Sequence, residues 1–218
     1  MPLELCNHRQ KAADAVQRFR DIREPGPREE GTGQAPRPAL DPMGGFVQLM
    51  RELVEENGLP DARVSLQRAA LPRPGPFCRA KLWSMVVLHR DRLIAALELK
   101  SHVPPAGPNS GTLAADALGR AHDFWTAYRE GAFRVDVPKP FLGWLILVDD
   151  QARATRYEQL CKALVREQHY TAACVVHSRS GNGTEGRYEE GSEPTGLTSF
   201  VADFAAHMAA CARRSPCA

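Results

Sequence analysis

The chain has 218 residues, enough for one sizeable core or a core with a small appendage, because domains usually hold roughly 100–200 residues. Its 43% of hydrophobic and 25% of charged residues are ordinary for a soluble globular protein. The net charge of +2 neither indicates nor excludes a nucleic-acid partner. No apolar stretch approaches the roughly 20 residues that a membrane helix needs, so we expect no membrane association.

The cysteines point to a reducing compartment. Six are present, and none belongs to a CxxC pair or to a Cys/His cluster with zinc-site spacing. Cys161 and Cys174 stand in apolar segments, where a buried free thiol is the expected state. The first residues also lack the basic head and apolar run of a signal peptide, so a cytoplasmic location is predicted.

The N-terminal part is predicted to form a helix and a linker that precede the main domain. Apolar side chains recur at helical spacing within residues 3–23, namely Ala12, Ala13, Val16, Phe19 and Ile22. Residues 24–42 then hold five prolines and several glycines with almost nothing apolar to bury, as in a linker or a surface loop. We therefore divide the chain into residues 1–42 and a main domain at residues 43–218.

The clearest predicted element is a β-hairpin in the middle of the chain. Before it, the pattern predicts a helix over the apolar positions 46–54, closed by Gly58, and a short extended segment at 63–66. The hairpin strands are residues 82–88 and 93–99, which are rich in apolar and β-branched residues and flank a polar turn. The second strand is nearly continuous in hydrophobicity, which indicates a central place in a sheet.

Helices and strands alternate in the second half of the chain. We expect helices at about 113–130, 154–169 and 200–213, strands at 141–148 and 171–177, and a mobile loop at 180–195. Helices that alternate with strands after a hairpin predict an α/β fold, in which a mixed central sheet is flanked by helices on both faces.

Glu98 and Lys100 stand at the end of the second hairpin strand, where alternation directs both side chains to the same face. Burying a carboxylate and an ammonium in a core strand is costly unless the pair is used. Phosphodiester hydrolysis uses both: the carboxylate and the Leu99 carbonyl can hold Mg²⁺, and the lysine can orient or deprotonate a water. Glu-x-Lys also occurs by chance, and a plain strand-end ion pair is the alternative.

The acid that normally accompanies Glu-x-Lys is missing. Nucleases with this motif usually carry an aspartate on the preceding strand, and the hairpin places Ser84 there, fourteen positions before Glu98. Serine offers a neutral oxygen rather than the charge that a hard cation prefers. Asp91 falls in the turn, at the far end of the hairpin. The alternative donors are three acids of the preceding predicted helix: Glu52, Glu55 and Glu56.

Several blocks of the chain match one known family in its order. They are residues 81–87 (KLWSMVV), 93–101 (LIAALELKS), 123–133 (DFWTAYREGAF), 140–144 (PFLGW), 156–161 (RYEQLC), 164–167 (LVRE) and 170–174 (YTAAC). Together they resemble the XhoI-like type II restriction endonucleases of the PD-(D/E)xK nuclease superfamily. In that family a Lys-Trp-Asp run precedes an Ala-Ala-(Leu/Ile)-Glu-x-Lys-Ser strand.

The resemblance implies a restriction-endonuclease-like core, with residues 43–218 as the nuclease domain. It implies a homodimer that cuts double-stranded DNA at the palindrome CTCGAG and uses Mg²⁺. By the same resemblance Glu98 is the metal carboxylate and Lys100 the catalytic lysine. Ser84 stands at the position of the first metal-binding aspartate.

Ser84 is one of three departures from the family pattern. The asparagine-rich run is largely missing from the loop at 101–112, where Ala114-Ala115 also replaces two acids at the start of the next helix. The segment 150–157 is shorter than in the family. Three functions follow: an active restriction endonuclease, a catalytically impaired member that keeps the fold with or without DNA binding, and an unrelated α/β protein with a chance ion pair.

Three further groups have a functional and a structural interpretation. Aromatic residues that follow a helical pattern are expected in the core rather than in a base-stacking surface: Trp125, Tyr128 and Phe133. His102 is expected to be a plain loop histidine. Asp149-Asp150 is expected to be an ordinary strand-to-loop junction rather than a metal-binding pair.

Overall fold

The computed structural model describes residues 3–5, 7–23, 41–72, 80–103, 110–133, 139–179 and 186–214. The elements within these ranges are, in chain order, α1 (His8–Arg23), α2 (Gly44–Glu56), β1 (Arg63–Pro72), β2 (Ala80–His89), β3 (Arg92–His102), α3 (Ser110–Arg129), β4 (Phe141–Val148), α4 (Gln151–Arg166), β5 (Ala172–Ser178), β6 (Tyr188–Glu190) and α5 (Leu197–Arg214). The strands form one sheet in the order β1-β2-β3-β4-β5-β6.

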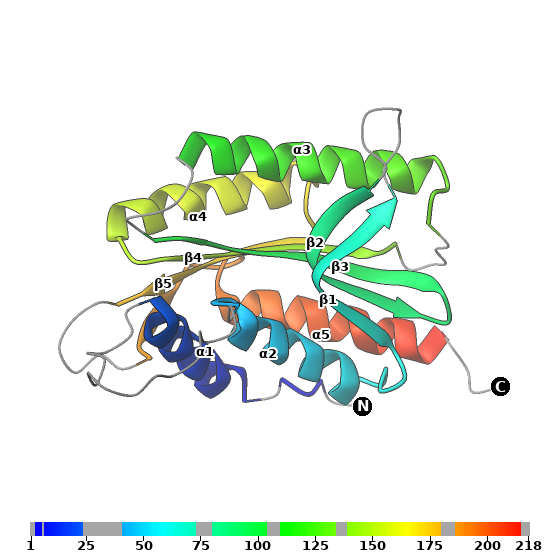
Figure 1. Cartoon of the computed structure of the whole chain (residues 1–218), viewed down its shortest axis with the longest axis horizontal. Coiled ribbons are helices and arrows are strands. Elements are labelled where there is room, and N and C mark those ends of the chain that lie inside the picture. Colours follow the sequence, from blue (N-terminus) through cyan, green and yellow to red (C-terminus); the bar gives the residue numbers. More distant parts are fainter. Residues whose placement is uncertain are drawn as a thin grey trace, which may run out of the picture.

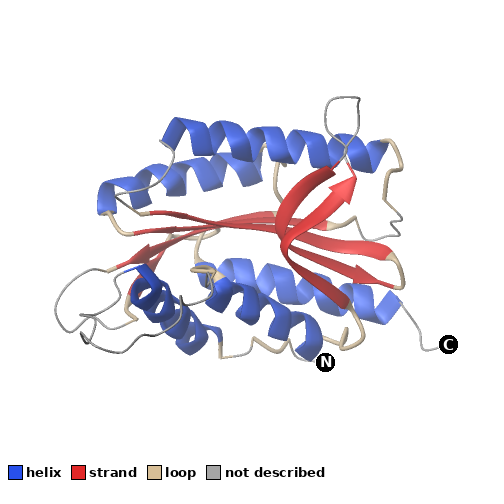
Figure 2. Ribbon diagram, in the orientation of Figure 1, coloured by secondary structure: helices blue, strands red, loops and turns tan. Residues whose placement is uncertain are grey.

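The sheet is mixed. β1, β2 and β3 are antiparallel neighbours, β4 and β5 continue parallel to β3, and β6 is antiparallel to β5. Parallel neighbours need a crossover, and two crossovers of the same hand that advance in one direction place α3 and α4 on the same face. Figures 1 and 2 show α3 and α4 above the sheet and α1, α2 and α5 below it. The predicted α/β fold with helices on both faces is confirmed.

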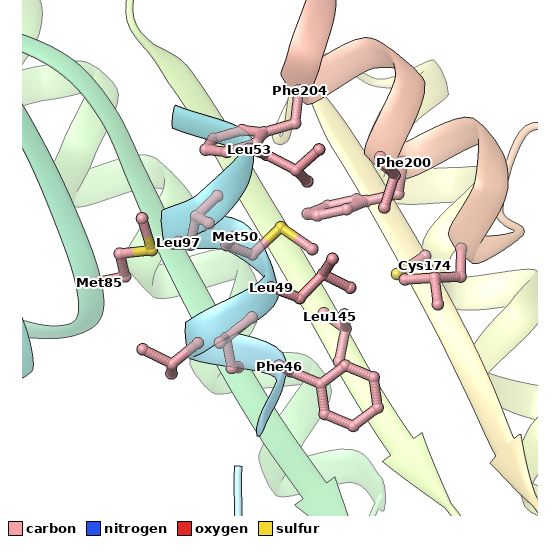
Figure 3. Packing of buried hydrophobic residues seen from close by; sticks show 14 of the residues in the cluster. Phe46, Leu49, Met50, Leu53, Met85, Leu97, Leu145, Cys174, Phe200 and Phe204 are labelled. Carbon is pink, nitrogen blue, oxygen red and sulfur yellow. The ribbon is translucent and has the colours of Figure 1, made fainter. Parts of the chain in front are cut away.

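One hydrophobic core lies between the sheet and α1, α2 and α5. Figure 3 shows how the apolar face of α2 meets the strands and α5, through Phe46, Leu49, Met50, Leu53, Met85, Leu97, Leu145, Cys174, Phe200 and Phe204. Full burial of a large apolar side chain contributes about 1.5–3 kcal/mol relative to exposure. The packing therefore fixes α2 and α5 against β3, β4 and β5.

A second core lies between the opposite face of the sheet and α3 and α4. Successive side chains of β4 enter the two cores in turn, so all of β4 is buried, which explains its uninterrupted apolar sequence. Trp125 and Phe133 are buried in this second core and Tyr128 packs against it, as predicted. The surrounding helices thus cover both faces of the central strands.

The turn of the β2–β3 hairpin consists of Arg90 and Asp91. Both residues have positive φ, 52° and 60°, as a tight two-residue hairpin turn requires. His89 still pairs with Arg92, so each hairpin strand extends one residue further into the turn than predicted. The Asp91 carboxylate lies 4.0 Å from the Arg63 guanidinium at this exposed end.

Several boundaries differ from the sequence prediction, and strand pairing accounts for the differences at β1 and β6. α1 begins at His8 rather than at residue 3, and β1 extends to Pro72 because β2 pairs along its length. The loop predicted at 180–195 contains β6, which β5 holds by pairing Val176 with Glu190. Residues 24–40 of the predicted linker and residues 180–185 of the predicted loop lie outside the described residues.

The buried cysteines are free thiols, as predicted for Cys161 and Cys174. Burial raises the pKa of both thiols and, at Cys211, raises the pKa to about 11. All three therefore stay protonated and unreactive near neutral pH. No helix in the described ranges has the length and apolar character to cross a membrane.

Two helical glycines should respond in opposite directions to the same substitution. A Cβ on Gly45 of α2 would lie 2.7 Å from the backbone Cα of Ala15 in α1, whereas a Cβ on Gly119 of α3 would meet nothing within 4 Å. We expect Gly45→Ala to lower the free energy of unfolding by about 1–3 kcal/mol through overpacking. We expect Gly119→Ala to raise it by about 0.5–1 kcal/mol because alanine favours a helix interior. Urea denaturation measures both, and a stabilising Gly45→Ala would contradict the close approach of α1 and α2.

Candidate active site

Glu98 and Lys100 lie on β3, on the face of the sheet that α3 and α4 cover. Ala96, two residues earlier on the strand, belongs to the core of that face. Glu98 Oε1 lies 2.7 Å from Lys100 Nζ, so the predicted same-face pair is confirmed. The Glu98 side chain is only 3% exposed and that of Lys100 is 33% exposed. The carboxylate is thus buried, and the ammonium beside it is partly exposed to solvent.

Ser84 lies on β2 next to this pair. The hairpin register pairs Met85 with Leu97, which brings Ser84 beside the following residues of β3. The Leu99 N–H donates to the Ser84 hydroxyl oxygen at 3.0 Å, and the hydroxyl donates to the Leu99 carbonyl at 3.3 Å. On its other side β2 passes a β-bulge in β1, between Leu66 and Ala69. Ser84 therefore ties β2 to β3 through the backbone of the residue that separates Glu98 from Lys100.

Arg120 of α3 completes the charged cluster. Its Nη1 lies 3.3 Å from Glu98 Oε2 and its Nε lies 2.7 Å from Asp116 Oδ2. The same Nη1 donates to the Leu82 carbonyl at 2.6 Å, and the guanidinium lies 6.0 Å from the centre of the Trp83 ring. Burial alone would lower the pKa of Arg120, but the two carboxylates outweigh it and raise this pKa. Each Glu98 oxygen thus faces a cation.

The sequence prediction contains neither Arg120 nor Asp116. Their spacing of four positions on a helix was a usable signal, because such residues are neighbours on one helix face. An i,i+4 ion pair usually marks a solvent-exposed face, however, and only the packing of α3 on β3 brings this one to Glu98. Arg120 is 16% exposed, which distinguishes it from a surface pair.

Tyr170 lies near the same cluster, at the N-terminal side of β5. It is buried, and its hydroxyl donates to the Ala117 carbonyl of α3 at 3.0 Å. Burial, and then the negative charge of Glu98, raise the pKa of Tyr170. The phenol therefore stays neutral and anchors α3 over the charged side chains.

The acids of α2 do not supply a second carboxylate. α2 packs on the opposite face of the sheet from Glu98, in the core shared with α1 and α5. Glu52 forms an ion pair with Lys11 of α1, and Glu55 pairs with Arg51 at 3.0 Å. The hypothesis that this helix donates the missing acid is wrong, because the sheet separates the two faces.

The oxygen atoms around Glu98 are of the kind that Mg²⁺ binds, but they carry little charge. A carboxylate, the Leu99 carbonyl and the Ser84 hydroxyl are all hard oxygen ligands. Within the described residues, no group of three or more His, Cys, Asp or Glu side chains is placed to hold a metal ion. The donor atoms therefore fit a hard cation in type and supply a single negative charge.

A separate polar cluster lies at the carboxyl ends of β3 and β4. His102 is the last residue of β3 rather than a loop residue, and its Nδ1 lies 2.7 Å from the Tyr157 hydroxyl. Burial lowers the pKa of His102. The Asp149 carboxylate lies 3.3 Å from the Arg153 guanidinium, and Asp150 caps α4 by accepting the Arg153 N–H. Both acids thus have structural partners, as the junction interpretation predicts.

Comparison with known proteins points to a single family. The family model described as "Restriction endonuclease XhoI" matches residues 24–156 and 151–190. The type II restriction enzyme AbrI of Azospirillum brasilense is 41% identical over 194 residues, which cover 84% of this chain and 87% of AbrI. The type II restriction enzyme XhoI of Xanthomonas vasicola is 40% identical over 148 residues, 56% of this chain and 59% of XhoI. BstVI of Geobacillus stearothermophilus, also a type II restriction enzyme, is 32% identical over 197 residues, 77% of this chain and 87% of BstVI.

These matches include the charged cluster on β3 and α3. Ser84, Glu98, Lys100 and Arg120 all lie within the residues that the family model covers. No solved structure matches the chain. The family model covers more than half of the sequence, and all three relatives are named type II restriction enzymes. The chain belongs to the XhoI family of type II restriction endonucleases.

Proposed function

We propose that the chain hydrolyses both strands of double-stranded DNA with Mg²⁺ at a palindromic site, CTCGAG by its resemblance to the family. The observation that carries the proposal is the buried Glu98 carboxylate, 2.7 Å from Lys100, inside the matched region. A homodimer suits a palindrome, because two identical sites then face two identical strands. The free buried cysteines support a location of the protein in a reducing cytoplasm.

Three groups would hold the metal ion: the Glu98 carboxylate, the Leu99 carbonyl and, as a neutral ligand, the Ser84 hydroxyl. A bound Mg²⁺ would polarise the scissile phosphate and lower the pKa of a coordinated water. Ser84 and Leu99 are already joined by hydrogen bonds of 3.0 and 3.3 Å, which fixes the carbonyl in place. The backbone of two paired strands thus presents these oxygens on a rigid support.

Lys100 is the residue that would contact the substrate. Its ammonium is the exposed partner of the pair, while Glu98 is buried. An ammonium at this position can hold the attacking water or a phosphate oxygen and offset the negative charge that develops in the transition state. Its bond to Glu98 orients it before DNA arrives, which lowers the entropy cost of reaching the reactive arrangement.

The charge of the cluster favours a second candidate function, a catalytically impaired family member that keeps the fold with or without DNA binding. Glu98 and Asp116 contribute two negative charges, and Lys100 and Arg120 contribute two positive charges, so the four groups sum to zero. A dication is attracted by net negative charge. An aspartate in place of Ser84 would supply it, and the serine does not.

A cleavage assay separates the two candidates. The purified chain is incubated with Mg²⁺ and a duplex that carries one CTCGAG, and with a matched duplex in which the two central base pairs of the site are changed. Cutting of the first duplex by the native chain, lost in Glu98→Ala, supports the active enzyme. Cutting by Ser84→Asp alone supports the impaired member. If neither protein cuts, tight binding to the CTCGAG duplex supports an impaired member that binds DNA. If neither protein cuts and neither binds the duplex, the proposed cleavage is contradicted.

A further inference from the structure

We propose that Arg120 competes with the metal ion for Glu98, so that its guanidinium occupies the carboxylate until a divalent ion displaces it. The inference rests on the proposed function in one respect, that Glu98 is the carboxylate that takes the ion. Arg120 then sets the concentration of metal at which the site fills. It is a positioning residue, which acts on the ion through Glu98 and Asp116.

The first support is the way Glu98 is neutralised. A buried carboxylate needs a partner cation, and Glu98 has one on each oxygen, Lys100 at 2.7 Å and Arg120 at 3.3 Å. Lys100 reaches solvent and can swing its ammonium away on a flexible stem. Arg120 is 16% exposed and is held from several sides. Arg120 is therefore the cation that stays beside Glu98 when Lys100 turns to a substrate.

The second support is electrostatic. Mg²⁺ binds oxygen at roughly 2.0–2.1 Å, so an ion on Glu98 Oε2 would lie within a few ångströms of a guanidinium that donates to the same oxygen. Like charges that close repel strongly in a partly buried site. The Ser84 hydroxyl adds no negative charge to compensate. Metal and guanidinium thus exclude each other at this oxygen.

The third support is that Arg120 has other partners to keep. Its Nε lies 2.7 Å from Asp116, a shorter contact than the one to Glu98, and its Nη1 is 2.6 Å from the Leu82 carbonyl. The Asp116 side chain is 39% exposed, so this pair lies toward solvent. An isolated buried charge is costly. Release of Glu98 would not create one, because Arg120 would remain paired with Asp116.

Metal binding in the absence of DNA tests the inference. Isothermal titration calorimetry with Mg²⁺, repeated with Mn²⁺, is carried out on the native chain and on Arg120→Gln, which keeps length and polarity without the charge. We expect the apparent Kd to fall about tenfold, equivalent to about 1.4 kcal/mol. Arg120→Lys, which retains the charge, should stay within about threefold of native.

Two controls locate the effect. Arg153→Gln removes a similar i,i+4 arginine from its 3.3 Å contact with Asp149 on α4 and should leave the Kd unchanged. Arg120→Gln combined with Glu98→Gln should lose the tighter binding, because the competed carboxylate is gone. Circular dichroism of each variant checks that it is folded at the temperature of the titration.

An unchanged or higher Kd in Arg120→Gln, or no measurable binding by that variant, overturns the inference. Arg120 would then order Glu98 for the metal or serve only the fold. The titration is independent of cleavage. A chain that fails to cut DNA while Arg120→Gln binds metal more tightly refutes the proposed function alone, and a chain that cuts without this gain refutes the inference alone.

Discussion

Replacing Glu98 with glutamine is expected to lower the rate of DNA cleavage by about a hundredfold to a thousandfold. Glutamine keeps the shape and one carbonyl oxygen but removes the negative charge that would hold Mg²⁺. Removal of a single preorganised group that stabilises charge in a reaction typically costs about a hundredfold to a thousandfold in rate. Single-turnover cleavage of the CTCGAG duplex, with protein in excess, measures the chemical step directly.

The stability of Glu98→Gln has to be measured beside its activity. The variant leaves Lys100 and Arg120 next to a neutral amide, and breaking a buried ion pair costs about 3 kcal/mol. Glu158→Gln is the matched control, since Glu158 of α4 pairs with Lys162 at 2.8 Å away from the cluster on β3. We expect Glu158→Gln to cut at the native rate. A folded Glu98→Gln that does the same would remove Glu98 from the reaction.

Ser84→Asp is expected to lower the Mg²⁺ concentration needed for half-maximal cleavage by about tenfold or more. The Leu99 N–H already points at the side-chain oxygen of residue 84 from 3.0 Å, so a carboxylate there would accept the same hydrogen bond. The added charge changes the sum over the cluster from zero to −1. The site would then hold two carboxylates on adjacent strands, the arrangement that the resemblance implies.

Ser84→Asn is the control for Ser84→Asp. Asparagine has nearly the volume of aspartate and an oxygen that can accept from Leu99, but it is neutral. We expect little change in the metal requirement with asparagine, because the charge and not the hydrogen bond makes the difference. Equal gains with both substitutions would show that serine limits the site by its size, which would contradict the electrostatic account.

Much of the sheet could be predicted from sequence because its strands are buried on both faces. β4 alternates between two cores and therefore reads as eight consecutive apolar residues. β6 could not be predicted, since Tyr188-Glu189-Glu190 has no strand pattern and owes its conformation to pairing with β5. Local pattern thus sufficed where burial was complete, and failed where an edge strand depends on its neighbour.

The site was predictable only along the strand. Alternation on β3 was enough to place Glu98 and Lys100 on one face, and the hairpin register was enough to place Ser84 beside them. The handedness of the β3–α3–β4 crossover determines which helix covers that face of the sheet. Local sequence pattern does not indicate this handedness. For this reason the acids of α2 were considered as alternative donors although they lie on the other face, and Arg120 was not considered.

The most direct test of the nuclease site compares Ser84→Asp with the double variant Ser84→Asp/Glu98→Gln on the same CTCGAG duplex with Mg²⁺. The comparison does not depend on how active the native chain is, because the first substitution adds the second carboxylate that the resemblance implies. We predict that Ser84→Asp cuts both strands within the site and that the double variant leaves the duplex intact. Cutting by the double variant at the rate of Ser84→Asp would contradict the assignment of the reaction to Glu98.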